Sequence, residues 1–392
     1  MLERYSSRQG GDMNININVI SKSVGLQLFD KYYAYTQHLM KKHNFKSEYS
    51  ISFSRKFKKN NKNILFAYMP DDIKCLPALE NYDAVILDNA EEPLSTTTTQ
   101  CVINLLFQKN NVFAQANSVL SRSHPLANKI IPFFGDIGKM RDYHLRSFYP
   151  QYYDEWSGFG DKKVIAAING SDRAHRHYFF NLLRKKIPTI PVVENLQNQV
   201  IHETKDSLIE TEEDAKFRQL VNTTVSITRN IKNSDIYYKN SVKCGINNKF
   251  GEIPPGYFIM DKYTSYQCII FPESNWVNDE LSVTEKAIKC FIANTFPFPI
   301  AGANVNKLYN QIGFSTAWNL LPHRLQEFDS VDNHERRFNL AVDSIEWLSN
   351  NRDVFESLTA REMLNQNYYT FFTKKFDLAS VRKLDSIINL EK

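Results

Sequence analysis

The sequence lacks the long apolar runs, clustered cysteines and secretory leader that mark several common protein classes. No apolar run approaches the roughly 18–20 residues needed to span a bilayer. The five cysteines are widely spaced and form neither a Cys-x-x-Cys pair nor a Cys/His zinc pattern. The opening stretch, MLERYSSRQGGD, is polar and has no apolar signal segment. We therefore expect no membrane span, reduced thiols and a cytoplasmic protein whose residues 1–12 form a flexible extension.

A strong excess of charge of either sign is also missing. The formal net charge is +5 over 392 residues, which is compatible with phosphate-bearing ligands without requiring nucleic acid. Hydrophobic residues make up 42% of the chain and charged residues 23%, values that exclude a disordered protein. Aromatic residues are abundant, with 27 Phe, 20 Tyr and 4 Trp, so some can stack on sugars or bases beyond those in the core. The length allows two domains, each with its own core.

The first part of the chain alternates segments of strand and helix character, which is typical of a doubly wound α/β domain. Strands are expected over Asn14–Ile20, Asn63–Tyr68 and Asp83–Asp88, with a helix over Leu26–Lys42. The intervening stretch 52–63, SFSRKFKKNNKN, is basic and carries two interleaved Phe residues. It is interpreted either as a solvated loop or as a contact for the phosphate backbone of a nucleic acid.

A strand-loop-helix-strand unit is expected over residues 266–301. The runs Tyr266–Phe271 and Phe296–Ala301 have the composition of buried strands. Ser282 or Thr284 can cap the helix between them. Ligands of parallel sheets bind beyond the carboxyl ends of the strands, where helix N-termini favour phosphate. The polar residues of interest here are Glu273, Asn275, Thr284, Glu285 and Lys286.

A second unit of the same kind is expected over residues 163–186. Lys163–Ile168 predicts a buried strand, and Arg173–Lys186 predicts a helix with an apolar face. Basic residues at a helix start directly after a strand describe a phosphate cradle, for which Arg offers bidentate hydrogen bonds. Taken alone, the Thr-Glu-Lys of the first unit is a capping pattern first, and the histidines of the second unit are ordinary surface histidines. The residues of interest are Asn169, Arg173, His175 and Arg176.

Together the two units resemble the C-terminal half of the GT-B glycosyltransferases related to α1,3-fucosyltransferases, and a group of phage and bacterial glycosyltransferases. The resemblance covers about residues 163–350, roughly half the chain. The chain departs from the pattern in the order of Ser274 and Asn275, and in Gly170 or Ser171, where an Arg is usual. The residues that carry the resemblance are Asn169, Arg173, His175, Arg176, Phe271, Glu273, Ser274, Asn275, Thr284, Glu285, Lys286, Pro297, Phe298, Gly302, Leu308, Gly313 and Phe314.

The resemblance implies an α/β fold with two Rossmann-like domains, the GT-B architecture. We expect an acceptor-side N-terminal domain over residues 13–160 and a nucleotide-sugar domain over residues 161–350. Residues 351–392 would form C-terminal helices that pack back on the N-terminal domain. Helical patterns extend over Arg352–Gln366 and Tyr368–Leu390.

The implied activity is transfer of a sugar from a nucleotide-sugar donor to a saccharide or another hydroxyl acceptor. Basic residues would neutralise the diphosphate, and Glu273 or Glu285 would orient ribose or sugar hydroxyls. No metal or other cofactor is expected, because basic side chains and helix dipoles carry the phosphate charge. The implied sugar-donor ligands are Asn169, Arg173, Arg176, Glu273, Asn275, Thr284, Glu285 and Lys286.

An inverting transfer also needs a base for the acceptor hydroxyl. The candidates are the N-terminal-domain carboxylates Asp88, Glu91, Glu92 and Asp136. One alternative is a phage-type DNA glycosyltransferase acting on a flipped hydroxymethylated base, which the basic stretch 52–63 favours. The other is a non-catalytic module that binds a sugar or nucleotide, which the missing Arg favours. The phage and bacterial resemblance places the protein in the cytoplasm of a bacterium or of an infected host cell.

Overall fold

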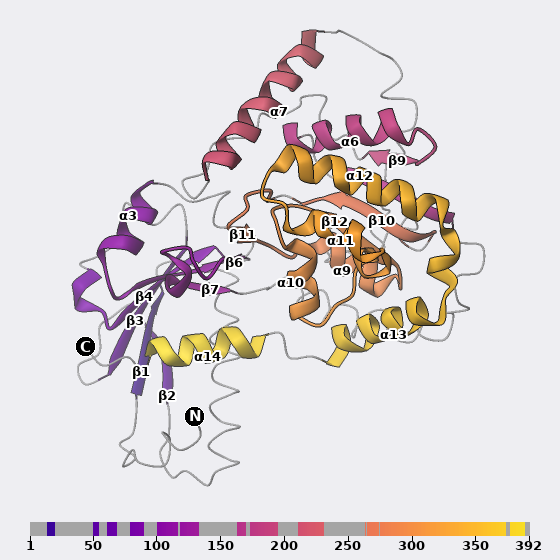
Figure 1. The fold of residues 1–392 in the computed structure, drawn as a ribbon. Helices are drawn as coiled ribbons and strands as arrows, with labels where there is room; N and C mark the ends of the chain where they lie inside the picture. Colours follow the sequence, from indigo (N-terminus) through magenta and orange to yellow (C-terminus); the bar gives the residue numbers. More distant parts are fainter. Residues whose placement is uncertain are drawn as a thin grey trace, which may run out of the picture. The chain divides into compact units, whose positions relative to one another are not determined.

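The computed structural model describes residues 14–19, 50–54, 61–68, 79–89, 100–116, 118–132, 163–169, 173–194, 211–230, 263, 265–273, 275–373 and 377–388. The chain forms two compact units (Figure 1). Unit 1 consists of Met1–Gly135 and Lys375–Lys392, and unit 2 consists of Asp136–Lys374.

Unit 1 is built on a parallel sheet with the strand order β2-β1-β3-β4-β5-β7. Its inner strands are continuous apolar runs, because both faces of a parallel sheet are covered. Residues 64–67 and 84–87 are accordingly buried without interruption. The described strands of this sheet are β1 (Asn14–Val19), β2 (Ser50–Ser54), β3 (Lys62–Tyr68), β4 (Ala84–Asn89), β5 (Val112–Ala116) and β7 (Ile130–Pro132), and the short β6 (Val119–Leu120) lies outside it.

Two of the described helices belong to unit 1 and contact this sheet. Helix α3 (Gln100–Gln108) contacts β5, and α14 (Asp377–Ile388) contacts β7. The Ser380 hydroxyl donates a hydrogen bond to the backbone oxygen of Pro132, which ties α14 to the end of β7. The last helix of the chain therefore belongs to the unit that contains the first strands.

Strand β2 differs from the prediction of a loop over residues 52–63. Ser50–Ser54 pairs in parallel with β1, and β3 begins at Lys62. The alternation Ser-Ile-Ser-Phe-Ser is the strand signal that the basic composition obscured. Residues 55–60, which carry most of the positive charge, lie outside the described residues, so a nucleic-acid contact there stays a prediction. The helix expected over Leu26–Lys42 also lies outside them.

Unit 2 is built on a second parallel sheet, with the order β12-β10-β8-β9. Strand β8 comes first in the chain, β9 pairs on one side of it and β10 on the other. The direction of strand addition therefore reverses between β8 and β10, which is the topological switch point of a doubly wound sheet. The strands of unit 2 are β8 (Lys163–Asn169), β9 (Val192–Glu194), β10 (Tyr266–Pro272), β11 (Glu280–Leu281) and β12 (Phe296–Ile300).

Helices cover both faces of this sheet. Cys268 and Ile270 join one apolar cluster with residues of α6 and α12, whereas the alternating Ile269 and Phe271 are buried outside that cluster. Figure 1 shows α6 and α12 on one side of β10 and α9 on the other. The helices are α6 (Ala174–Lys186), α7 (Glu212–Asn230), α9 (Glu285–Ile292), α10 (Val305–Gln311), α11 (His323–Gln326), α12 (His334–Asn350) and α13 (Leu358–Thr373). Both units are thus Rossmann-like, and the predicted fold class is confirmed.

The C-terminal helices divide at a different point from the one predicted. The expected break near Asn367 lies inside α13, which runs unbroken to Thr373 after a short 3-10 turn at Arg352–Glu356. Asn367 is buried, and its amide exchanges two hydrogen bonds with the backbone of Ser315, at 2.7 and 2.8 Å. An Asn normally disfavours a helix because its amide competes for nearby backbone groups. Here a loop 52 residues away satisfies that amide.

Candidate functional site

The two sequence motifs meet at one edge of the unit 2 sheet. Strands β8 and β10 pair in parallel, so their carboxyl ends lie together at the switch point. Helix α6 starts there after β8, and the loop that leads to α9 starts there after β10. The ring Nε2 of His175 lies 3.0 Å from the backbone oxygen of Glu273, which joins segments 98 residues apart.

The start of α6 is a buried, basic segment. Arg173 is its half-buried N-cap residue, and His175 and Arg176 are almost fully buried. Burial and the neighbouring Arg176 guanidinium hold the pKa of His175 well below its ordinary value, and Arg173 adds to this effect. The ring is therefore neutral, and it donates to Glu273 because a carbonyl oxygen only accepts. An exposed position for His175 is thus wrong, because the side chain is almost fully buried and contacts the backbone of Glu273.

The start of α9 is capped by Thr284. Its hydroxyl accepts a hydrogen bond from the backbone N–H of Lys286 at 3.4 Å, so the cap is Thr284 rather than Ser282. The same hydroxyl donates to Oε2 of Glu273 at 2.7 Å. The Lys286 ammonium lies 3.5 Å from the Thr284 oxygen and 3.9 Å from Oε2 of Glu273. Three predicted residues of the first motif therefore form one polar cluster.

Glu273 is the centre of that cluster. Its side chain has no solvent exposure, and its Oε1 accepts a hydrogen bond from the hydroxyl of Tyr309 at 3.1 Å. Its backbone N–H donates to Ile300 at the end of β12. Glu273 therefore links the ends of β10 and β12 to the start of α9 and to the C-terminal half of α10. The sequence did not identify Tyr309, because no local pattern marks a contact across 36 residues.

Asn275 shapes the loop that follows. Its Oδ1 accepts from the backbone N–H of Val277 at 3.1 Å, and its Nδ2 donates to the backbone and the carboxylate of Glu280. The loop packs closely on the chain after β12, because a Cβ added to Gly302 would lie 2.2 Å from the backbone oxygen of Val277. A side chain at position 302 would therefore separate the two loops.

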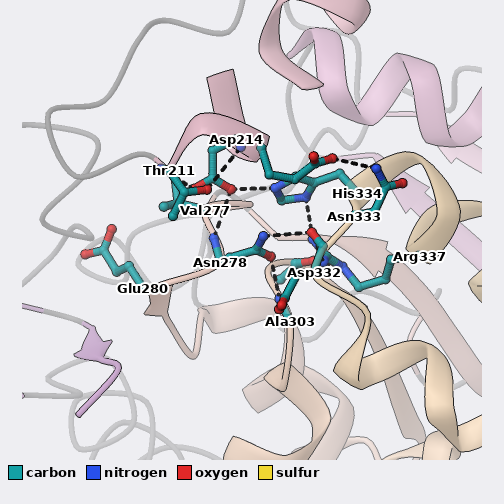
Figure 2. Close-up of polar contacts among 12 residues, drawn as sticks. Thr211, Asp214, Val277, Asn278, Glu280, Ala303, Asp332, Asn333, His334 and Arg337 are labelled. Atoms are coloured by element: carbon teal, nitrogen blue, oxygen red, sulfur yellow. Dashed lines mark hydrogen bonds and ion pairs between the residues drawn. The ribbon is translucent and has the colours of Figure 1, made fainter. Parts of the chain in front are cut away.

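A buried network stands behind this loop, centred on Asp214 of α7 and His334 of α12 (Figure 2). Asp214 accepts hydrogen bonds from His334 Nε2 at 2.5 Å, from the backbone N–H of Asn278 at 3.2 Å, and from both the N–H and the hydroxyl of Thr211. Arg337 contacts the other ring nitrogen of His334. We call Thr211, Asp214, Asn278, His334 and Arg337 the Asp214 network.

The protonation of this network follows from its donors. A guanidinium group only donates, so Nδ1 of His334 accepts from Arg337 and the ring proton sits on Nε2, facing Asp214. Burial lowers the pKa of His334 to about 4, with the nearby Arg337 acting in the same direction. Burial alone would raise the pKa of Asp214, but the bonds from His334 and Thr211 outweigh it and hold it below its ordinary value. The folded state thus contains a neutral histidine between a cation and an anion.

The Asp214 network connects to the switch point through Trp276. The Trp276 ring centroid lies 5.2 Å from that of His334 and 6.3 Å from that of His175. The side chain of Asn278 also bridges two loops, since it donates to Asp332 and accepts from the backbone N–H of Ala303 (Figure 2). The loops after β10 and β12 are therefore braced against α7 and α12.

The remaining candidate residues are placed only in part. Asn169 ends β8, Asp88 lies near the end of β4, and Glu285 is the first residue of α9. Their side chains lie outside the described residues, as do Glu91, Glu92 and Asp136 altogether. The catalytic base and the hydroxyl-binding carboxylate therefore stay predictions.

The described residues contain no group of three or more His, Cys, Asp and Glu side chains arranged to hold a metal ion. Nor does any of the described helices combine the length and apolarity needed to cross a bilayer.

No family model and no curated protein matches the chain. The chain is similar to a solved alpha1,3-fucosyltransferase with GDP-fucose, at 12% identity over 98% of this chain and 93% of that chain, with a TM-score of 0.46. It is also similar to an alpha,alpha-trehalose-phosphate synthase (UDP-forming) from Burkholderia vietnamiensis, at 11% identity over 83% of this chain and 74% of that chain, with a TM-score of 0.37. The family that the sequence motifs resemble is thus among the structures that the chain is similar to.

Proposed function

We propose that the protein is a glycosyltransferase that moves a sugar from a nucleotide-sugar donor to a saccharide or another hydroxyl acceptor. One observation carries the proposal: the contact between His175 and Glu273 brings the two motifs together at the switch point of the unit 2 sheet. Two helix starts and their basic side chains then lie at the sheet edge where nucleotides bind in doubly wound folds.

The proposal assigns the diphosphate to Arg173, Arg176 and Lys286. These three side chains are positively charged and Glu273 is negatively charged, so the four together carry an excess of positive charge. Arg176 and Lys286 are withdrawn from water, which strengthens their interaction with a bound phosphate. The same cations would stabilise the charge that develops on the leaving diphosphate during transfer.

The proposal assigns ribose or sugar hydroxyls to Glu285 rather than to Glu273. Both oxygens of Glu273 already accept hydrogen bonds inside the protein, from Thr284 and Tyr309. Glu285 opens α9, where a carboxylate is favoured by the helix dipole. Asn169 completes the sugar-donor side of the proposal, and Asn275, whose amide is bonded within its own loop, supports that side by shaping the loop.

The acceptor side of the proposal belongs to unit 1. Asp88, Glu91 and Asp136 are the candidate bases for the acceptor hydroxyl, each a carboxylate of the acceptor-side domain expected from the sequence. The transfer as proposed needs no metal, since the phosphate charge is met by basic side chains.

The test is a thermal-shift screen of the full chain against GDP, UDP, CDP and their sugars. A nucleotide at about 100 times its dissociation constant adds about 2.7 kcal/mol, which corresponds to roughly 5–10 °C for a unit of this size. We expect one nucleotide to produce this shift. Lys286→Ala and Arg173→Ala should each reduce it clearly, because each removes one of three proposed phosphate ligands.

The matched control is Lys185→Ala. It removes a positive charge from the exposed last turn of α6, about 18 Å along the helix from Arg173, and should leave the nucleotide shift intact. A screen in which no nucleotide shifts the wild type would overturn the proposal. Release of the nucleotide from its sugar, lost in Lys286→Ala, would separate an enzyme from a module that only binds.

A further inference from the structure

A buried hydroxyl of α10 lies two contacts from the proposed phosphate ligand Lys286. Tyr309 donates to Oε1 of Glu273, and Thr284 donates to Oε2 of the same carboxylate. Lys286 contacts both partners, because its ammonium lies 3.5 Å from the Thr284 hydroxyl and 3.9 Å from Oε2 of Glu273. Tyr309 is therefore connected to Lys286 through one buried carboxylate.

The direction of these contacts follows from proton counting. Each hydroxyl has a single proton, and a carboxylate only accepts, so Thr284 and Tyr309 both direct their protons at Glu273. The lone pairs of Thr284 are then left for the backbone N–H and the ammonium of Lys286. The hydrogen bonds therefore lead from the acceptor Glu273 through Thr284 to Lys286, which is the last donor.

The position of the Lys286 ammonium depends on where the Glu273 carboxylate is held. A lysine side chain is a point charge on a flexible stem, so its own geometry does not fix the ammonium. The carboxylate, in contrast, is held at one oxygen by Tyr309 and at the other by Thr284. Without the Tyr309 hydroxyl, the charge of Glu273 is freer to shift towards Lys286 and form a tighter ion pair. A lysine paired in that way is a weaker phosphate ligand.

We infer that Tyr309 is a positioning residue for the proposed sugar-donor site: through Glu273 and Thr284 it holds the Lys286 ammonium in place for the diphosphate. The inference rests on the proposed function and adds to it a residue on α10 that contacts no ligand itself. It also gives Glu273 a role behind the site instead of a contact with sugar hydroxyls.

The test measures binding of GDP, UDP, CDP and inorganic pyrophosphate to the full chain by calorimetry. Tyr309→Phe keeps the ring and removes only the hydroxyl. It should weaken binding of pyrophosphate and of the preferred nucleoside diphosphate by about five- to tenfold, a coupling usual for residues in one hydrogen-bond network. The corresponding nucleoside, which has no phosphate, should bind equally to the variant and the wild type. General damage to the fold would weaken both kinds of ligand.

The matched control is Tyr178→Phe. Tyr178 is a half-buried phenol of the same unit that packs against Phe217 and Phe338, and it should show no change with any of the probes. A second arm places Tyr309→Phe in the Lys286→Ala background. There the hydroxyl should have no further effect on diphosphate affinity, because the side chain that it positions is gone. An equal loss in both backgrounds would show that Tyr309 acts by another route and would overturn the inference.

Failure of this inference is distinguishable from failure of the proposed function. Binding that Lys286→Ala weakens and Tyr309→Phe leaves unchanged would overturn the inference alone. A wild type that binds none of the nucleotides would overturn both. If Tyr309→Phe does not fold, Thr284→Val and Thr284→Ser test the same series of hydrogen bonds. Val should weaken diphosphate binding and Ser should restore it, and equal binding by the two variants would count against the inference.

Discussion

Acidification from about pH 7 to pH 5 should lower the free energy of unfolding of unit 2. In His334→Gln this decrease should be smaller by about 2 kcal/mol. The pKa of His334 falls from its ordinary value of 6.5 to about 4 in the folded chain, mainly through burial and also through Arg337. Between these two values the unfolded chain binds a proton that the folded chain does not. The free energy of unfolding is therefore at its full value above pH 6.5 and falls as the pH drops towards 4.

The magnitude follows from the size of the shift. A difference of about 2.5 in pKa is worth about 3 kcal/mol when it is fully expressed. Evaluating both titrations at pH 7 and at pH 5 leaves about 2 kcal/mol for that interval. His175 acts in the same direction, because burial and Arg176 also lower its pKa. The loss in the wild type should therefore exceed the share of His334, and only the difference between wild type and variant measures that share.

Tryptophan fluorescence is suited to this measurement. All four tryptophans, Trp156, Trp276, Trp318 and Trp347, belong to unit 2, so urea unfolding followed in this way reports on that unit. His334→Gln provides an amide that can accept from Arg337 and donate to Asp214 without titrating. His323→Gln, which changes an exposed histidine at the start of α11, is the matched control and should lose as much stability as the wild type. An equal loss in His334→Gln and wild type would refute the assignment of a neutral His334.

Two substitutions test how the loops of unit 2 are held, both by the same urea assay. Gly302→Ala should lower the free energy of unfolding by about 1–3 kcal/mol, because its Cβ would meet the backbone oxygen of Val277 at 2.2 Å. If the variant were as stable as the wild type, the two loops would have to separate freely. Asn367→Ala should cost about 1–3 kcal/mol, because it leaves the backbone of Ser315 without two buried partners. Asn365→Ala, exposed on the same helix, should stay within about 0.5 kcal/mol of wild type.

The local elements could be predicted from the sequence because their signals are local. Apolar runs between polar loops predicted strands that match β4, β8 and β10 to within one or two residues. The Thr-Glu-Lys pattern predicted the start of α9, and Thr284 does cap it through the N–H of Lys286. Strand β2 was missed because five residues rich in serine and followed by a run of basic residues have the composition of a loop.

The break between the last helices could not be predicted, because a distant contact decides it. Asn367 lies inside α13, and the backbone of Ser315 satisfies its amide. The Asp214 network has the same character, since it joins residues from α7, α12 and the loop after β10 that are 64 to 120 residues apart. No window of sequence contains both partners of such a contact, so the pattern of either element alone does not reveal it.

The proposed roles of the two carboxylates in the first motif depend on contacts of Glu273 that the sequence does not reveal. Glu273 and Glu285 both follow a strand and flank a helix start, and either satisfies the chemistry of a hydroxyl ligand. The fold distinguishes them because Tyr309 and Thr284 both donate to Glu273, which has no solvent exposure. A carboxylate already satisfied on both oxygens has little to gain from a sugar hydroxyl, whereas it can fix the position of a neighbouring cation. In the proposed site, the carboxylate at the helix start is therefore the one assigned to the sugar donor, and Glu273 is suited to hold that site in shape.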